Sequence, residues 1–172
     1  SGAREGNICA VWQPEDFALI KPGVYVLASG DDFQNRPGME GISVEDPKAA
    51  FPRFLSLFVQ EKTGAGLHPA SVIYPGARVS PSAWVGPLCV VSDGAVIEDG
   101  VRLEANVFVG PGCHLGAGTV VEPGAVLLVK VRTGRRCLIH SGAVLGCDGF
   151  GMLPPADGNP PVKIPQLGGV VL

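Results

Sequence analysis

Four side chains near the C-terminal end of the sequence have types that could bind a polar substrate. Asp148 lies in a glycine-rich turn, where its carboxylate could contact a sugar or stand near a reacting group. An Asx-type turn that caps the loop is the structural alternative. Phe150 could line an apolar channel or pin the loop to the rest of the fold. Lys163 and Gln166 could contact a diphosphate or amide groups, or could order the loop against a neighbouring subunit.

A basic cluster precedes these residues. Lys130, Arg132, Arg135 and Arg136 follow one another closely, and they could form a docking patch for an acidic protein. A solvated basic face is the alternative. The formal net charge of the chain is -3, so there is no basic footprint for nucleic acid.

The histidines are few and scattered. His140 follows an apolar residue that should face inward, so its own side chain should face outward. It could act as a general base, or it could be a structural or subunit-interface residue. We interpret His68 and His114 as surface histidines.

The five cysteines form neither a CxxC pair nor a zinc spacing with histidine. We therefore expect no metal site, and we expect free thiols in a reducing cytoplasm. A catalytic nucleophile among them is the alternative.

The elements that must position these residues follow a repeat of six residues. An aliphatic residue recurs at every sixth position, with a single β-branched Thr as the exception. The series is Leu67, Ile73, Val79, Val85, Val91, Ile97, Leu103, Val109, Leu115, Val121, Leu127, Thr133, Ile139 and Leu145. Four places after each member stands a small or β-branched residue, and Cys89, Cys113 and Cys137 belong to this second series.

The repeat predicts a parallel β-helix with about 14 hexads. Each hexad supplies a short strand and a corner, and three hexads close a triangular coil of 18 residues. Coils would stack at about 4.8 Å, which is the strand spacing within a sheet. Glycine and proline at the corners supply unusual φ values and preset turns.

The composition agrees with this interpretation. The 172 residues include 25 Gly and 16 Pro, which alone would suggest disorder. However, 46% of the residues are hydrophobic and only 17% are charged, so the chain should fold. We expect no membrane span, because no apolar run approaches about 20 residues.

Residues 1–66 lack the repeat and predict a small α/β domain. Ile8–Trp12 and Val24–Ala28 are typical of strands, and Asp31–Gly38 is typical of a loop. Asp46 followed by Pro47 predicts a helix start, and apolar spacing of three and four predicts a helix over Lys48–Lys62.

Three segments resemble a known family. They are CLIHSGAVLGCDGFG at 137–151, VKIPQLG at 162–168, and the helix SVEDPKAAFPRFLSLF followed by LHPASVI. They resemble the UDP-3-O-acylglucosamine N-acyltransferases of lipid A biosynthesis. The resemblance runs in order over about residues 8–172, and the DGFG and KIPQ pair is its most specific part.

This resemblance implies a left-handed β-helix, a hand that the spacing does not choose, and a homotrimer with active sites between subunits. The implied reaction moves a 3-hydroxyacyl chain from acyl carrier protein to the 2-amino group of a UDP-linked 3-O-acylglucosamine, without a further cofactor. The family's general-base histidine lies on coils after KIPQ, beyond Leu172. Its aromatic and Asn contacts to uracil lie before the start of this sequence.

We therefore expect a mainly β chain, with a partial uridine-binding-like α/β domain at 1–66 and a left-handed β-helix at 67–172. We expect an N-acyltransferase in the cytoplasm, with Asp148, Phe150, Lys163 and Gln166 as substrate contacts. The expected docking residues for the carrier protein are Arg132, Arg135 and Arg136. Three alternatives remain: an inactive fragment or trimeric scaffold of this family, another hexapeptide-repeat nucleotide-sugar acyltransferase, and a zinc-dependent carbonic anhydrase.

Overall fold

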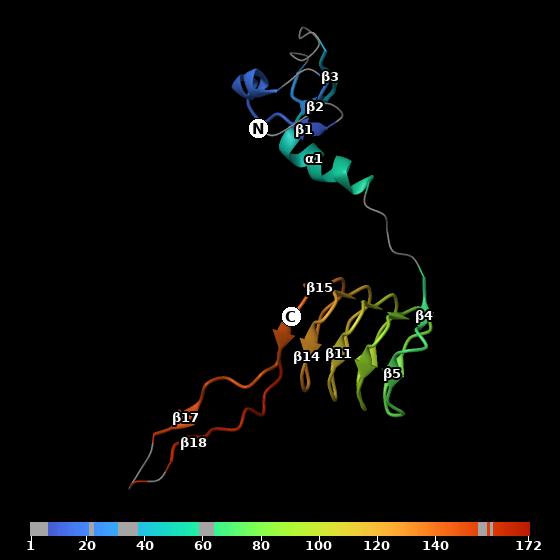
Figure 1. The fold of residues 1–172 in the computed structure, drawn as a ribbon, viewed down its shortest axis with the longest axis vertical. Helices are drawn as coiled ribbons and strands as arrows, with labels where there is room; N and C mark the ends of the chain where they lie inside the picture. The colour runs from blue at the N-terminus through green and yellow to red at the C-terminus, as the bar shows by residue number, and fades with distance from the viewer. Residues whose placement is uncertain (1–6, 21–22, 31–37, 59–63, 155–157, 159) are drawn as a thin grey trace. The chain divides into compact units, whose positions relative to one another are not determined.

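The computed structural model describes residues 7–20, 23–30, 38–58, 64–154, 158 and 160–172 (Figure 1). The chain divides into two compact units, Ser1–Lys62 and Thr63–Leu172. No helix among the described residues is long and apolar enough to cross a membrane.

The N-terminal unit is a three-stranded parallel sheet with one α-helix. Its strands are β1 (Ile8–Ala10), β2 (Tyr25–Ala28) and β3 (Glu40–Ser43), in the order β1-β2-β3. The strands predicted at Ile8–Trp12 and Val24–Ala28 are thus present in slightly shorter form. The 3-10 helix η1 (Pro14–Leu19) and strand β3 were not expected. The predicted loop at Asp31–Gly38 lies almost wholly outside the described residues.

The helix α1 (Pro47–Ser56) begins where the sequence predicts. Asp46 Oδ1 accepts hydrogen bonds from the backbone N–H groups of Lys48, at 2.9 Å, and Ala49, at 3.2 Å. The helix ends at Ser56, earlier than predicted, because Leu57 and Phe58 form a turn. Phe51 packs edge-on against Trp12 at 5.9 Å between ring centroids.

The second unit contains the predicted β-helix, which we call the prism. Its strands are two residues long, and the second residue of each belongs to the inward aliphatic series. They are β4 (Gly66–Leu67), β5 (Val72–Ile73), β6 (Arg78–Val79), β7 (Trp84–Val85), β8 (Val90–Val91), β9 (Val96–Ile97), β10 (Arg102–Leu103), β11 (Phe108–Val109), β12 (His114–Leu115), β13 (Val120–Val121), β14 (Val126–Leu127), β15 (Leu138–Ile139) and β16 (Val144–Leu145).

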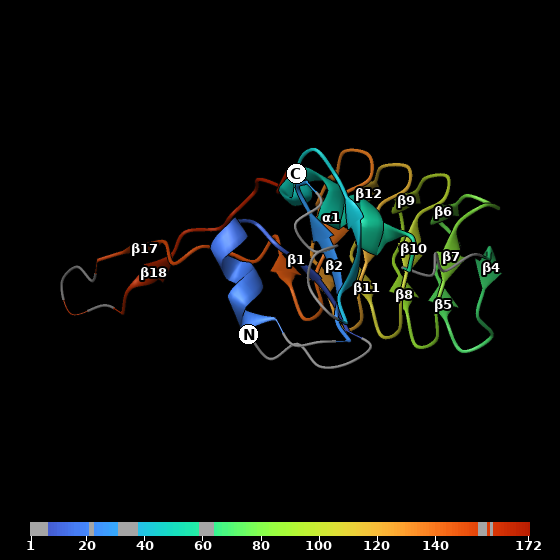
Figure 2. The ribbon, with the colours of Figure 1, turned by 90° about the horizontal axis from the view of Figure 1, so that it is seen from above.

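Parallel pairing between coils has the predicted register of 18 residues. Leu103 aligns with Val85 on one side and with Val121 on the other. The three faces are the sheets β4-β7-β10-β13-β15, β5-β8-β11-β14-β16 and β6-β9-β12 (Figures 1 and 2). The predicted fold class, a mainly β chain with a left-handed parallel β-helix and a small α/β unit, is confirmed.

The core of the prism consists of members of the two predicted inward series, except that Leu67 on the end coil is 52% exposed, because no coil among the described residues precedes it to cover it. Val85, Leu103, Leu115 and Leu127 are fully buried. Cys89 and Cys113 are also fully buried, and burial raises the pKa of both thiols. They therefore serve as small core residues and not as nucleophiles.

The single exception in the aliphatic series, Thr133, has a polar partner inside the prism. Its Oγ1 accepts a hydrogen bond from the backbone N–H of Gly116 at 3.0 Å and lies 3.4 Å from Oγ1 of Thr119. Thr119 also donates to the carbonyl of Gly134. The buried hydroxyls are therefore hydrogen-bonded, as buried polar groups must be.

Most corners of the prism have left-handed backbone at the third residue after the inward aliphatic one, although Ala70, Gly76 and Ser82 on the first coils do not. From 88 to 142 every residue at this position has φ between 55° and 74°. Six are glycines, and four carry side chains: Leu88, Asn106, Lys130 and Arg136. An L-residue other than glycine is strained in this conformation.

After β16 the chain leaves the prism and returns to it. Residues 146–169, which we call the excursion, contain the antiparallel hairpin of β17 (Met152–Leu153) and β18 (Val162–Lys163), which projects away from the coils (Figures 1 and 2). Val171 then pairs with Arg132 in parallel, and Leu172 accepts a hydrogen bond from Gly134. The return thus continues the third face of the prism.

We predict that Leu127→Ala lowers the free energy of unfolding by about 2–5 kcal/mol, because a fully buried side chain leaves a cavity. Leu138→Ala is the matched control, since Leu138 lies on the next coil with 56% of its surface exposed. We expect it to cost less than about 1 kcal/mol. Urea denaturation measures both, and equal losses would contradict the assignment of inward and outward positions.

Candidate functional site

A pocket of about 500 Å³ lies where the excursion joins the prism. One wall is the corner after β14, with Leu128, Val129 and Lys130. The departing chain supplies Gly146 and Asp148, and the returning chain supplies Gln166, Leu167 and Gly168. Two of the predicted substrate contacts, Asp148 and Gln166, therefore line one pocket.

Asp148 and Lys163 hold the base of the excursion together. Lys163 Nζ lies 3.3 Å from Oδ2 of Asp148 and donates to the carbonyl of Gly149 at 3.3 Å. Both side chains are about half exposed. The ion pair joins the two chain directions of the excursion and neutralises the Asp148 carboxylate. Lys163 itself does not line the pocket.

Gln166 lies beside two glycines of the DGFG motif. Its side-chain amide is 3.5 Å from the place where Gly151 would carry a Cβ, and 4.0 Å from the corresponding place at Gly149. These glycines leave room for the amide close to the backbone. Gln166 can therefore present hydrogen-bond donors and an acceptor to a ligand in the pocket.

Phe150 stands apart from this arrangement. Its side chain is 98% exposed, and it is not among the residues that line the pocket. It does not pin the excursion to the prism. A role in binding an apolar chain stays a prediction.

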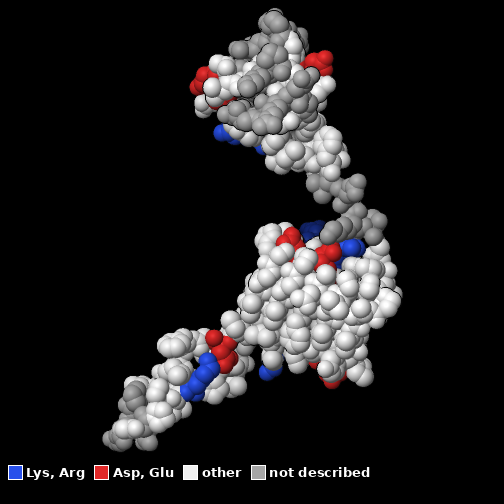
Figure 3. Space-filling model, viewed as in Figure 1, with Lys and Arg blue, Asp and Glu red and all other residues white. Residues whose placement is uncertain are grey.

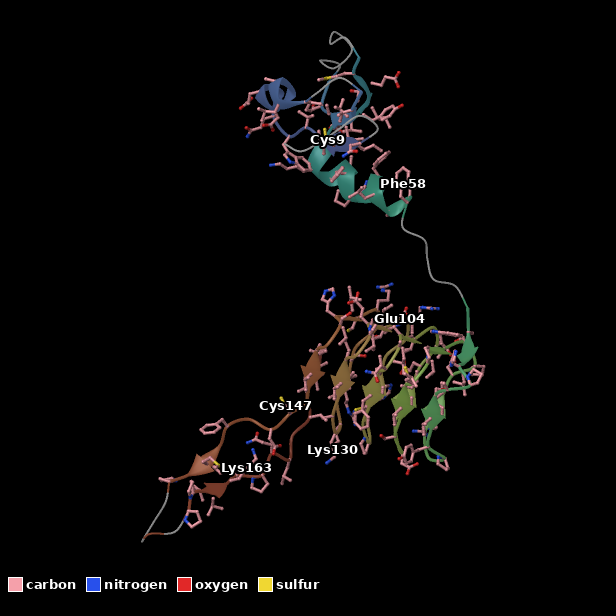
Figure 4. The ribbon with its side chains drawn as sticks, viewed as in Figure 1. Cys9, Phe58, Glu104, Lys130, Cys147 and Lys163 are labelled. Atoms are coloured by element: carbon pink, nitrogen blue, oxygen red, sulfur yellow. The ribbon has the colours of Figure 1, made fainter. Side chains whose placement is uncertain are left out.

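The basic cluster separates into two parts. Arg132, Arg135 and Arg136 are exposed around the coil that ends the third face. Lys130 lines the pocket instead, at the edge of the prism beside the base of the excursion (Figure 4). Lys130 was expected to share the role of the arginines, and its place in the pocket was not predicted. The signal was available, because Lys130 occupies the corner position at which most hexads have glycine.

Two of the histidines pair with a glutamate of the preceding coil. His114 Nε2 lies 2.6 Å from Oε1 of Glu98, whose Oε2 accepts the backbone N–H of Ala117 at 2.9 Å. These two hydrogen bonds, with a smaller contribution from Arg135, lower the pKa of Glu98.

The second pair repeats this device. His140 Nδ1 lies 3.2 Å from Oε2 of Glu122, which also accepts the backbone N–H and the hydroxyl of Ser141. The bonds from Ser141 and His140 lower the pKa of Glu122. His140 is exposed, as predicted, and lies outside the pocket. His68 accepts the backbone N–H of Ala70 through Nδ1.

All five cysteines are free. Among the described ranges, no group of three or more His, Cys, Asp or Glu side chains gathers as a set of metal ligands. The N-terminal unit has a smaller pocket of about 260 Å³ beside its sheet, with Tyr25, Ile42 and Phe54 among the lining residues.

The six-residue repeat is similar to that of known proteins. Residues 94–128 match the model of bacterial transferase hexapeptide repeats. The chain is also 37% identical over 96 residues to UDP-3-O-acylglucosamine N-acyltransferase from Pseudomonas entomophila (strain L48). The expected resemblance to that family is confirmed over this segment. The match covers 55% of this chain and 27% of that protein, so the chain spans about a quarter of its length.

Solved structures show weaker likeness. A mutant of GDP-perosamine N-acetyltransferase from Caulobacter crescentus, in complex with CoA and GDP-perosamine, is 17% identical over 77% of this chain and 64% of that chain, with a TM-score of 0.26. The acetyltransferase domain of PglB from Neisseria gonorrhoeae FA1090, in complex with acetyl coenzyme A, is 17% identical over 70% of this chain and 82% of that chain, with a TM-score of 0.23. Scores this low carry no argument about function.

We predict that acid destabilises the prism through Glu98 and Glu122. Their pKa values are lowered in the folded chain, so the unfolded chain binds more protons as the pH falls. The stabilisation is complete above the ordinary glutamate pKa of 4.5 and is lost as the pH falls through the lower folded values.

Urea denaturation between about pH 6 and pH 3 measures this loss. The double variant Glu98→Gln/Glu122→Gln should show a flatter pH dependence than the wild type. Glu15→Gln, at an exposed position of the N-terminal unit, controls for the loss of a charge. An unchanged slope in the double variant would contradict the role of the two carboxylates.

Proposed function

We propose that this chain forms part of an N-acyltransferase that moves a 3-hydroxyacyl chain from acyl carrier protein to the 2-amino group of a UDP-linked 3-O-acylglucosamine. The observation that carries the proposal is the 37% identity over 96 residues with a protein named UDP-3-O-acylglucosamine N-acyltransferase. The pocket at the junction of the prism and the excursion supports it, because the DGFG and KIPQ segments both contribute to its walls.

The proposed reaction forms a carbon–nitrogen bond and breaks the thioester bond of the acyl donor. The amine must lose a proton as its nitrogen attacks the carbonyl carbon, and the thiol of the carrier leaves. Backbone N–H groups would stabilise the oxyanion of the intermediate. Asp148 and Gln166 are the proposed substrate contacts, Lys163 positions Asp148, and Phe150 is the proposed contact to the acyl chain. We propose no cofactor beyond the acyl carrier protein.

We assign no catalytic base to the described histidines. His114 and His140 each pair with a different glutamate, and that glutamate also accepts a backbone N–H of the next coil. Neither histidine lines the pocket. The resemblance puts the general-base histidine on coils that follow KIPQ. The free cysteines support a reducing compartment, and we propose the cytoplasm.

The outer surface of one prism face supports a homotrimer. On the sheet β5-β8-β11-β14-β16 every outward residue is apolar, and Figure 3 shows a broad area of this face without charged side chains. The outward residues are Val72, Val90, Phe108, Val126 and Val144. An apolar ladder of this kind is suited to contact with another subunit.

A trimeric scaffold without activity is the second candidate. Two observations favour it. His114 and His140 are each hydrogen-bonded to a glutamate, and no histidine is among the described residues that line the pocket. The two candidates differ in whether any acyl chain is transferred.

We predict acyl transfer by a version of the protein extended past Leu172, and none by the 172-residue chain, because the expected base follows KIPQ. The assay uses 3-hydroxyacyl carrier protein and UDP-3-O-acylglucosamine. Activity in both versions would remove the need for the added segment, and activity in neither would favour the scaffold. Light scattering on the same preparations is expected to give the mass of three chains.

We predict that Arg135→Glu/Arg136→Glu weakens binding of the acidic carrier protein, because exposed arginines on this coil would attract its negative surface. The arginine patch, with Arg132, is the proposed docking surface. Binding is measured at low salt, where screening is weak. Arg53→Glu in the N-terminal unit is the matched control. Unchanged affinity of the double variant would remove the docking role.

A further inference from the structure

We propose that Lys130 is an anion-binding residue of the pocket and that it contacts a phosphate group of the bound substrate. This inference rests on the proposed function, which supplies two phosphate-bearing ligands. One is the UDP-sugar with its diphosphate, and the other is the phosphopantetheine arm of the carrier protein. Lys130 would recognise the chemistry that they share.

The backbone of Lys130 gives the first reason. Its φ is 58°, at the corner position where six of the ten consecutive residues are glycine. A lysine there is strained, and glycine would relieve the strain. The side chain is exposed, so the packing of the prism does not require its ammonium group. A strained side chain that the fold does not need suggests a functional reason for it.

The charge balance of the pocket gives the second reason. Asp148, the carboxylate in the lining, is already paired with Lys163 at 3.3 Å. The ammonium group of Lys130 forms no hydrogen bond or ion pair with any residue in the described part of the chain. The pocket therefore has one uncompensated positive charge, which favours an anionic ligand.

The surroundings of Lys130 give the third reason. Its stem packs above Gly112, whose Cβ position would be 3.6 Å from Lys130 Cγ. The returning chain passes against the Lys130 carbonyl at Gly169, where a Cβ would collide with that oxygen. Lys130 thus lines a pocket that also has Leu128, Val129 and Leu167 as apolar walls. These walls suit the organic part of a ligand whose phosphate meets the ammonium.

The test measures binding and stability on the 172-residue chain. Lys130→Met removes the charge and keeps the strained backbone, Lys130→Gly removes both, and Lys130→Arg keeps the charge. Leu88→Gly is the matched control, because Leu88 has a φ of 59° at the same corner position and lies outside the pocket. The probes are UDP, 4′-phosphopantetheine and pantetheine without its phosphate, each titrated by NMR up to millimolar concentration.

We expect one phosphate-bearing probe to bind the wild type and Lys130→Arg, and to bind Lys130→Met and Lys130→Gly about tenfold or more weakly. Leu88→Gly should bind like the wild type. Lys130→Gly and Leu88→Gly should both raise Tm by about 1 °C or more, because each relieves the left-handed corner. Preference for UDP or for phosphopantetheine identifies the source of the phosphate.

Three results would overturn the inference. The first is equal binding of the phosphate-bearing probe by Lys130→Met and the wild type. The second is that the wild type binds neither phosphate-bearing probe. The third is that Lys130→Met loses as much affinity for pantetheine, which has no phosphate, as for the phosphate-bearing probes. If Lys130→Met binds the carrier protein more weakly but binds the small probes as the wild type does, the inference is wrong and Lys130 belongs to the docking surface of the arginine patch. These measurements need no catalysis, so failure of acyl transfer would leave the phosphate result standing and would count only against the proposed function.

Discussion

The structure depends on the alignment of each coil with the next through parallel backbone hydrogen bonds. That alignment requires the chain to turn a corner after each two-residue strand, so that the strand 18 residues later lies beside the first. From 88 to 142 each corner is formed by one residue with positive φ, without a break. The inward aliphatic residues fill the interior that results, and the outward residues become three regular ladders.

Acidic side chains at the corners join adjacent coils by accepting hydrogen bonds from backbone N–H groups. Glu98 and Glu122 each reach the backbone N–H of the residue 19 positions later, on the next coil. Asp93 receives the N–H of Gly76 on the coil before. Short strands provide few backbone bonds per coil, and these carboxylates add cross-coil bonds at the turns. The histidines beside the two glutamates belong to this structural network.

The sequence predicted the prism well because the place of a residue in the hexad decides whether it faces inward, faces outward or forms a corner. Inward, outward and corner residues could be read from the hexads, including the buried cysteines. The pocket could not be predicted in this way, because it forms between the corner Leu128–Lys130 and residues at the two ends of the excursion, whose path the repeat does not specify. The partners of Thr133, His114 and His140 lie on neighbouring coils, so the repeat gave their places but not their contacts. Strand β3 is short and only partly apolar, and it lacked a signal.

The return of Val171 beside Arg132 has a consequence for the evolution of such proteins. The excursion leaves one face of the prism and rejoins the next, so the coils before and after it are stacked as though it were absent. Residues can then be added to or removed from the hairpin without any change in the register of the scaffold. A strictly periodic scaffold thereby carries a segment whose length is free to vary, and the pocket lies at the boundary between the two.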